Sequence, residues 1–190
     1  MRSVELLGQE NKPAPGDLRF VQAYVNTVDV ESGRDRFHDV GGLRAWLSTH
    51  CELAQDFSLG ETDRLKAIEF REALRTVLTE GQESDESALA TIDEVGARSA
   101  LRLGTTDDGR LELASTGEGM YAALGRLLAA VHTAMLEGTW ERLKICAADE
   151  CRWAFYDASK NRSGTWCSMQ TCGNRAKVRG HRHRQRSAAA

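Results

Sequence analysis

The sequence predicts an α+β fold that is mostly α, with a helical N-terminal body, one β-hairpin and a small C-terminal module. Three observations predict it. Apolar residues recur at helical spacing through most of residues 17–138, one segment near residue 105 alternates instead, and four of the five cysteines fall within residues 146–172. A chain of 190 residues is long enough for one medium domain and one small appended module.

The first helix is predicted to begin at Asp17, which we expect to cap it. Residues 1–16 before it are polar and hold both prolines of the chain, so we expect a mobile lead-in. β-Branched residues in the helix would also suit a strand, but strict alternation is absent and the spacing favours a helix. Its apolar face consists of Leu18, Val21, Val25 and Val28.

Two further helices follow. One is predicted after Asp39, and the other covers the sequence ETDRLKAIEFREALRTVLTEG, in which acidic residues lead and Gly81 favours termination. The apolar side of the helix after Asp39 holds Leu43, Trp46, Leu47 and His50. The apolar stripe of the next helix consists of Leu65, Ile68, Leu74, Val77 and Leu78.

A shorter helix and the hairpin come next. In LRLGTTDDGRLEL, leucines alternate with polar residues on both sides of Asp108-Gly109, which predicts two strands joined by a turn. The shorter helix before the hairpin is predicted from Leu89, Ile92 and Val95.

The last predicted helix of the body is long. Ser115 and Glu118 have the spacing of a capping box, and Gly138 marks the expected end. The apolar face consists of Met120, Leu124, Leu127, Leu128, Val131 and Met135. Core packing is the simple interpretation of this face and of Trp46, and the alternative is that the helices enclose a pocket for a small-molecule effector.

The body, residues 17–140, carries no motif with a known chemical mechanism. It has no Gly-rich phosphate loop, no nucleophile elbow and no His-Glu-x-x-His sequence, and its histidines His38, His50 and His132 are scattered. We therefore expect no catalytic residues and no enzyme.

Charge is segregated along the chain. Residues 1–140 carry 14 Lys and Arg against 24 Asp and Glu, net −10, whereas residues 141–190 carry 11 against 4, net +7. Since only the C-terminal part attracts polyanions, a nucleic-acid partner should meet it there. No signal-peptide pattern and no apolar run of roughly 18–20 residues stands out, so we expect a cytoplasmic protein without membrane contact.

Cys146, Cys151, Cys167 and Cys172 follow the pattern Cys-x4-Cys-x15-Cys-x4-Cys. Two close pairs on either side of a hairpin-sized insert suit tetrahedral zinc. The alternatives are two disulfides, which a reducing compartment disfavours, or four buried thiols. Four thiolates fill the coordination sphere, so the predicted cofactor is one structural Zn²⁺, whose binding contributes on the order of 10 kcal/mol. We expect chelation to unfold this module and spare the body.

The zinc module is predicted over residues 141–186, with a short tail at 187–190. A hairpin with two ligands, followed by a helix with the other two, is typical of a treble-clef-like finger. The aromatic residues Trp153, Phe155 and Trp166 either form the small core behind the zinc or stack on bases. The residues predicted to contact nucleic acid are Arg152, Lys160, Arg162, Asn174, Arg175, Lys177, Arg179, Arg182 and Arg184.

The segment CAADECRWAFYDASKNRSGTWCSMQTCGNRAKVRGHRHR resembles the CGNR zinc-finger family, whose tetrad is present here as residues 172–175. The body is similar to the ABATE domain, a family described as a stress-induced transcription regulator, through YVNTVD, DVGGLRAWL and EFREALRTVL. This resemblance implies four cysteine zinc ligands and a bacterial DNA-binding regulator. Asn174 and Arg175 would either read bases or brace the zinc turn.

Three functions follow as hypotheses. The first is a transcription regulator that binds DNA through the C-terminal module and senses an effector or forms a homodimer through the body. The second is a zinc-stabilised protein-interaction or RNA-binding module without sequence-specific DNA recognition. The third is a thiol redox switch that releases zinc on oxidation.

Overall fold

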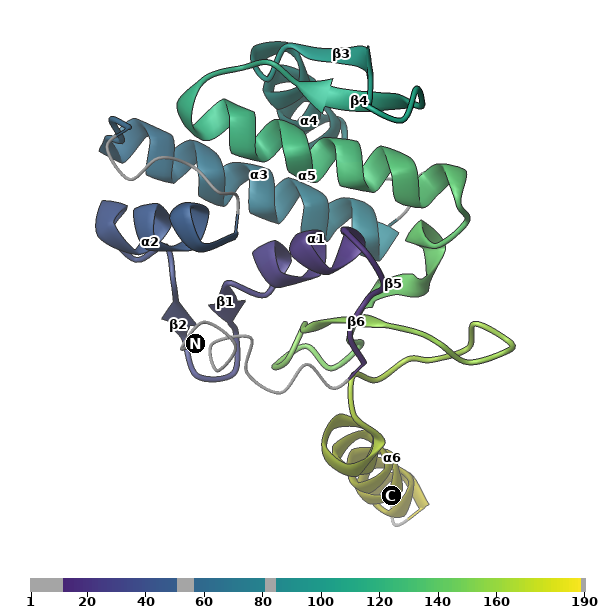
Figure 1. The fold of residues 1–190 in the computed structure, drawn as a ribbon. Helices are drawn as coiled ribbons and strands as arrows, with labels where there is room; N and C mark the ends of the chain where they lie inside the picture. Colours follow the sequence, from purple (N-terminus) through teal and green to yellow (C-terminus); the bar gives the residue numbers. More distant parts are fainter. Residues whose placement is uncertain (1–11, 51–56, 81–84, 189–190) are drawn as a thin grey trace.

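The body is built from helices that pack around one another, with short two-stranded sheets at its edges (Figure 1). The computed structural model describes residues 12–50, 57–80 and 85–188, so Cys51 and Gly81 lie outside the described residues. The body helices are α1 (Leu18–Val25), α2 (Val40–His50), α3 (Glu61–Glu80), α4 (Glu86–Arg98) and α5 (Gly119–Leu136). The mostly helical α+β fold predicted from the sequence is therefore confirmed.

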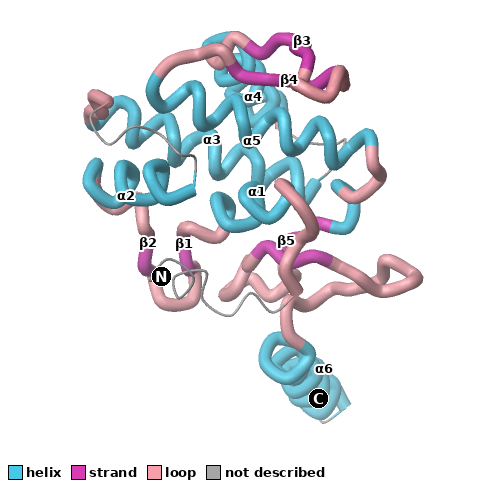
Figure 2. Tube along the Cα trace, in the orientation of Figure 1, coloured by secondary structure: helices cyan, strands magenta, loops and turns pink. Residues whose placement is uncertain are grey.

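In the part of the chain that the structure describes, three antiparallel strand pairs accompany the helices (Figure 2). They are β1 (Val28–Asp29) with β2 (Arg34–Asp35), β3 (Leu101–Thr105) with β4 (Leu111–Ser115), and β5 (Leu143–Ile145) with β6 (Ala154–Tyr156). The predicted hairpin is the second pair, in which Leu103 lies opposite Leu113 and Gly109 turns with a φ of 80°. The last helix, α6 (Asn174–Ala188), lies at the opposite end of the molecule from β3 and β4 (Figures 1 and 2).

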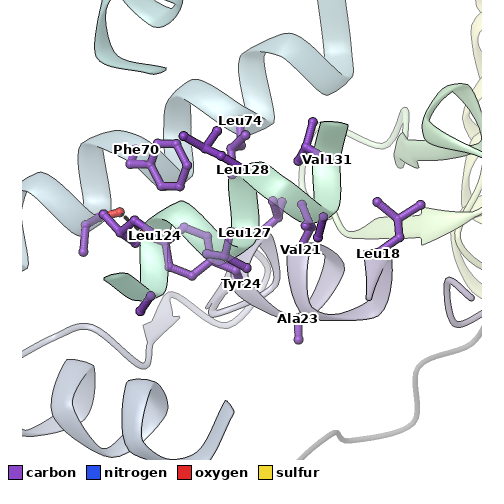
Figure 3. Packing of buried hydrophobic residues seen from close by; sticks show 14 of the residues in the cluster. Leu18, Val21, Ala23, Tyr24, Phe70, Leu74, Leu124, Leu127, Leu128 and Val131 are labelled. Atoms are coloured by element: carbon purple, nitrogen blue, oxygen red, sulfur yellow. Dashed lines mark hydrogen bonds between the residues drawn. The ribbon is translucent and has the colours of Figure 1, made fainter. Parts of the chain in front are cut away.

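Helix α5 lies at the centre of the hydrophobic core. α5 packs against α1 and α4, and α3 also packs against these two helices. Figure 3 shows how side chains from α1, α3 and α5 interdigitate. The buried contributors from these helices include Leu18, Val21, Tyr24, Phe70, Leu74, Leu124, Leu127, Leu128 and Val131. Burial of each large apolar side chain contributes about 1.5–3 kcal/mol, so this cluster provides the main stabilisation of the body.

Among the described helices, α5 is long and apolar enough to span a membrane by length and composition. Its residues nevertheless pack inside the body, with Ala123 and Leu124 fully buried. The central helix of a helical core needs apolar residues on most of its surface, which accounts for this composition.

The ends of two predicted helices differ from the prediction. Asp17 adopts a right-handed helical backbone conformation and its side chain makes no capping bond, so its predicted capping role is wrong. The helix then stops at Val25, and Val28 belongs to β1. By contrast, Asp39 does cap α2, since its Oδ1 accepts a hydrogen bond of 2.7 Å from the Gly42 N–H.

The predicted capping box before α5 is also wrong. Ser115 ends β4, and its hydroxyl donates to the Ser99 carbonyl at 2.8 Å. Glu118 occupies the N-cap position without a side-chain capping bond. The Ser115 hydroxyl thus joins the β3–β4 hairpin to the end of α4 and does not cap α5.

The apolar stripes of α3 and α5 are partly misplaced in the prediction. Leu65 is 53% exposed and Met135 is 47% exposed, although both were placed on apolar faces. Phe70, which lies outside the predicted stripe, is fully buried. In α3 the buried face also contains two arginines, and spacing of apolar residues alone cannot reveal such a face.

Two helical glycines should respond to alanine with opposite signs. A Cβ at Gly125 would come within 2.5–2.7 Å of the Ser115 and Ser99 side chains, whereas a Cβ at Gly96 would make an ordinary 3.8 Å contact with Leu128. We expect Gly125→Ala to cost about 2 kcal/mol through overpacking, and Gly96→Ala to stabilise by about 0.5 kcal/mol because alanine favours helix. Denaturant unfolding measures both, and equal effects would contradict the packing at Gly125.

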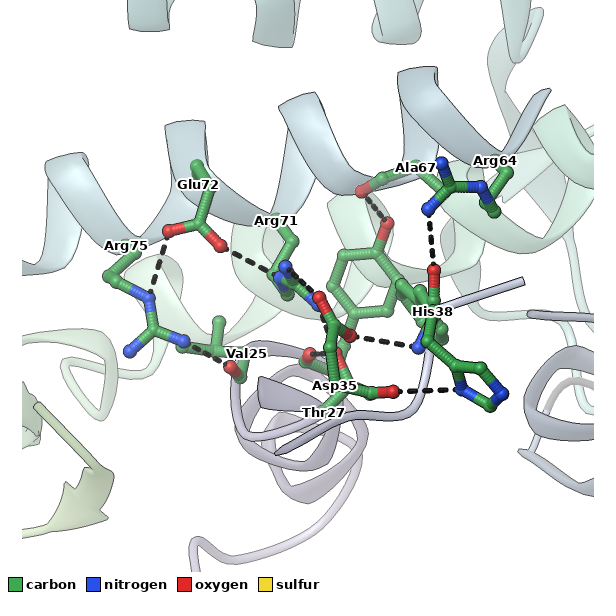
Figure 4. A network of polar contacts seen from close by, with 11 residues as sticks. Val25, Thr27, Asp35, His38, Arg64, Ala67, Arg71, Glu72 and Arg75 are labelled. Atoms are coloured by element: carbon green, nitrogen blue, oxygen red, sulfur yellow. Dashed lines mark hydrogen bonds and ion pairs between the residues drawn. The ribbon is translucent and has the colours of Figure 1, made fainter. Parts of the chain in front are cut away.

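The hairpin formed by β1 and β2 is fastened to α3 by a largely buried ion pair (Figure 4). Arg71, only 3% exposed, donates to both carboxylate oxygens of Asp35 at 2.7 and 2.8 Å and to the Thr27 hydroxyl at 3.1 Å. Desolvation opposes the charge of Asp35, but the Arg71 guanidinium outweighs it and holds the pKa of Asp35 below its usual value. The position of this hairpin is thereby set by α3.

Candidate metal centre and nucleic-acid interface

The first two predicted ligands lie in the turn between β5 and β6. The Cys146 N–H donates to the Trp153 carbonyl at 2.9 Å, and the Cys151 N–H donates to the Ala148 carbonyl at 2.8 Å. Arg152 follows with a φ of 50°, which closes the turn. The turn therefore directs two thiols to the same side from a five-residue separation.

The second pair lies where the chain enters α6. Cys167 precedes a five-residue turn of π-helix, Met169–Gly173, which contains Cys172 and continues directly into α6. Ser168 caps this turn by accepting a hydrogen bond from the Thr171 N–H at 3.3 Å. The predicted treble-clef-like order of hairpin and helix is present, with one ligand just before the helical turn and one inside it.

The four sulfur atoms form one cluster suited to a metal. All lie within 4.8 Å of one another, and the Sγ atoms of Cys151 and Cys172 each lie 3.7 Å from that of Cys167. A tetrahedron with Zn–S bonds of 2.3 Å has edges of about 3.8 Å. The residues thus fit zinc in both donor type and spacing, and the cluster is able to bind one zinc ion.

Without a cation the pKa values of three of the thiols are shifted in different directions. The hydrogen bond from Cys167 lowers the pKa of Cys151 to about 6, whereas burial raises the pKa of Cys172 to about 11. The pKa of Cys167 is raised, because its proton is held by the hydrogen bond to Cys151. A divalent cation would make the other thiolates favourable, so metal binding and proton release are coupled.

The aromatic residues of the module form a small core behind the cluster. Phe155 is fully buried beside Ala148 and the cysteines, and Trp153 and Trp166 pack against the same cluster while half-buried. These aromatic residues therefore lie in or against the small core of the module, as the core-packing interpretation predicted. A module this small needs such a core because it has little other apolar surface to bury.

Asp157, which the sequence analysis missed, organises the loop between β6 and Cys167. Its buried carboxylate accepts hydrogen bonds from Lys144 Nζ at 2.9 Å, the Gly164 N–H at 2.6 Å and the Ser159 N–H at 3.1 Å. Although burial opposes the charge, these donors hold the pKa of Asp157 well below its usual range. The Asp-x-Ser spacing after a strand is a signal that could have indicated this turn.

Asn26 of the YVNTVD segment docks the module onto the body. Its side-chain amide pairs with the Ala154 backbone, donating to the carbonyl at 2.9 Å and accepting from the N–H at 2.8 Å. Gln22, one turn earlier in α1, donates to the same carbonyl at 3.2 Å. Both side chains are buried, so α1 provides the hydrogen bonds that a neighbouring strand would give to β6.

A second buried side chain joins α3 to the module. Arg75, 4% exposed, donates to the Val25 carbonyl and to the Arg152 carbonyl, each at 2.6 Å. Leu143 and Ala154 of the module belong to the same hydrophobic cluster as the body helices. The two parts therefore share one core.

Residues 12–16, at the end of the N-terminal lead-in, lie between the body and the zinc module. The Lys12 carbonyl accepts from the Tyr156 N–H at 3.0 Å, while its ammonium donates to the Trp166 carbonyl at 2.8 Å and lies 4.6 Å above the Phe155 ring. The Ala14 N–H donates to the Gln22 side chain at 2.7 Å. Residues 12–16, predicted to belong to a mobile segment, are thus bonded to both the module and α1.

The tetrad residues have defined contacts of their own. Arg175 donates to Cys172 Sγ at 3.6 Å and to both carboxylate oxygens of Glu31 at 2.7 and 3.0 Å. Asn174 donates to the Gln170 carbonyl at 3.1 Å, within the turn that enters α6. These contacts suit a brace for the zinc turn, and whether either residue also reads bases stays a prediction.

The other residues predicted to contact nucleic acid lie at three places on the module. Arg152 is in the zinc turn, Lys160 and Arg162 are in the loop before Cys167, and Lys177 and Arg179 are on α6. All five are exposed. Arg182 and Arg184 continue α6, and their side chains lie outside what the structure describes.

The helix continues through Gly180, so the basic residues of α6 follow one continuous helix. Within its first turns, Arg175 and Arg179 line a cavity of about 500 Å³ together with Glu150. The structure thus brings these two predicted residues together, while the contact of any of the nine with nucleic acid stays a prediction.

In the body, a cavity of about 530 Å³ lies between α1, β4 and α5, lined by Phe20, His50 and Arg126 among others. His50 stacks on Trp46 with ring centroids 4.4 Å apart, and burial lowers its pKa. Binding of a small-molecule effector by the body stays a prediction.

Comparison with known proteins gave two family matches. A model described as "CGNR zinc finger" matches residues 142–185. A model described as "Putative stress-induced transcription regulator", ABATE, matches residues 18–138. A search of curated proteins found no match. The two matched regions follow in the order that the sequence resemblance implied.

Proposed function

Because this chain belongs to the ABATE family and carries a CGNR zinc finger after that domain, we propose that it is a DNA-binding transcription regulator. The finger contacts DNA through α6 and the two loops that hold Arg152 and Lys160. The observation that carries the proposal is the position of α6, a basic helix that continues from the zinc turn and extends away from the acidic body (Figure 1).

Charge and geometry support this assignment together. Residues 141–190 hold the excess of basic side chains, and their module is attached to an acidic body that repels phosphates. Cys167 and Cys172 lie at the start of α6, so a bound zinc ion would hold the turn from which this helix begins. The metal has a structural role in this proposal, since four thiolates leave no coordination position for a substrate.

In this proposal the body provides the additional DNA specificity that a single zinc finger lacks. One small module makes few base contacts, so a defined DNA site calls for a dimer or a second contact surface. We propose that the body forms a homodimer or senses a small molecule, with the cavity beside Phe20 and His50 as the place to test for an effector.

Replacing Lys177 with Gln should weaken DNA binding. Lys177 is exposed on α6, and loss of one phosphate contact should lower the affinity roughly threefold to tenfold and reduce the slope of log K against log salt by about 0.9. Arg102→Gln is the matched control, because Arg102 is an exposed cation on β3 at the far end of the molecule. Fluorescence anisotropy with a labelled duplex over a salt series measures both.

Equal behaviour of the two variants would assign any binding to net charge and overturn the proposed surface. Selection of fragments from genomic DNA by the zinc-loaded full chain then tests for a defined site. Enrichment of one sequence supports a regulator of transcription. Tighter binding of RNA than of duplex DNA would replace the proposal with an RNA-binding module.

A further inference from the structure

Arg175 and Arg179, on successive turns of α6, each form a bidentate ion pair with a carboxylate. The Nη1 and Nη2 atoms of Arg175 lie 2.7 and 3.0 Å from the Glu31 oxygens, and those of Arg179 lie 3.1 and 2.9 Å from the Glu150 oxygens. A guanidinium binds phosphate with this same paired geometry. The two carboxylates therefore occupy positions that suit phosphate oxygens.

The Arg175 guanidinium contacts two different parts of the chain. Its Nη2 donates to Cys172 Sγ in the zinc turn at 3.6 Å, and its Nε is buried. The same Nη2, together with Nη1, donates to Glu31, which lies in the loop between β1 and β2 of the body and whose side chain is 54% exposed. Removal of Glu31 from this contact would leave the contact to sulfur intact.

Space for a larger anion adjoins the pair. The cavity of about 500 Å³ at the start of α6 is lined by both arginines and by the polar side chains of Asn174 and Gln170. An exposed ion pair is weak, because water and salt screen it, so exchange of one anion for another costs little.

We propose that Glu31 occupies the position of a DNA backbone phosphate on Arg175, and that DNA binding exchanges this carboxylate for the phosphate. The body thereby competes with DNA for the first arginine of α6. The inference rests on the proposed function and adds the contact residue, the ligand group and the internal competitor.

The test compares two variants that each remove one negative charge from the body. Glu31→Gln removes the competitor, whereas Glu112→Gln removes an exposed carboxylate on β4, at the end of the molecule opposite α6 (Figure 1). Anisotropy with a labelled random-sequence duplex at one fixed salt concentration gives the affinities. We expect Glu31→Gln to bind about two- to fivefold more tightly than the native chain, and Glu112→Gln to bind as the native chain does.

A double variant shows whether the gain depends on Arg175. In the Arg175→Gln background, Glu31→Gln should bring no further gain, with zinc content measured for every variant. If Arg175→Gln loses zinc, Arg175→Met takes its place, because methionine also removes the charge while its flexible side chain fills the same space.

Equal gains for Glu31→Gln and Glu112→Gln, a loss of affinity in Glu31→Gln, or a gain that persists in the Arg175 variant would each overturn the exchange. Absence of DNA binding by the native chain and by every variant would instead overturn the proposed function. The two failures are thus distinguishable.

Discussion

Removal of zinc from the intact chain is expected to destabilise the helical body as well as to unfold the C-terminal module. A structural zinc site contributes on the order of 10 kcal/mol, comparable with the total stability of an ordinary domain. The body depends on the module because Leu143 and Ala154 belong to the common core. It also depends on it through Asn26 and Arg75, whose buried polar groups would lose their partners.

Amide hydrogen exchange with and without a chelator measures this effect. Protection in α1 and α3 should fall together with protection in β5 and β6, since α1 and α3 hold the side chains that dock the module. The hairpin β3–β4, at the far end of the body, serves as the internal reference (Figure 2). Full retention of protection in α1 after zinc loss would contradict the coupling and would restore the expectation drawn from the sequence, that the body is spared.

Asn26→Ala is expected to lower the free energy of unfolding by about 3 kcal/mol. The substitution leaves the buried Ala154 N–H without its acceptor, and an unsatisfied buried group costs about 1–3 kcal/mol. The lost bond to the Ala154 carbonyl and the small cavity add to this cost, although Gln22 still donates to that carbonyl. Denaturant unfolding of the zinc-loaded chain measures the change.

Asn161→Ala is the matched control, since Asn161 is exposed in the loop before Cys167. A surface substitution of this kind is expected to change stability by less than about 0.5 kcal/mol. If the two variants were equally stable, the paired contacts of Asn26 with the Ala154 backbone would not be holding the module to the body.

Local patterns were enough to predict much of the fold. Helical spacing after Asp39, alternation around Asp108-Gly109 and the cysteine spacing each report on neighbours close in the chain, and the structure confirms the elements they predicted. The zinc ligands were predictable for the same reason, because metal coordination restricts both residue type and separation.

Predictions that depended on which face of a helix meets the core were less accurate. In α3, Leu65 is exposed and Phe70 is buried, and the buried face of this helix also contains Arg71 and Arg75. Apolar spacing cannot reveal a buried arginine, since its burial depends on partners distant in sequence, here Asp35 and the Arg152 carbonyl. Similarly, the spacing of Ser115 and Glu118 suits a helix cap, but the Ser115 hydroxyl donates to the Ser99 carbonyl instead.

The sequence by itself determined the mostly helical class, the hairpin, the four-cysteine zinc site and the basic character of the C-terminal end. Only the tertiary structure decided that the module shares a core with the body, that Asn26 pairs with β6, and that Arg175 lies between Cys172 and Glu31. The physical reason is the distance along the sequence between the residues that set each property. Periodicity, ligand spacing and charge are properties of neighbouring residues, whereas the partner of a buried polar group is set by how distant segments pack together.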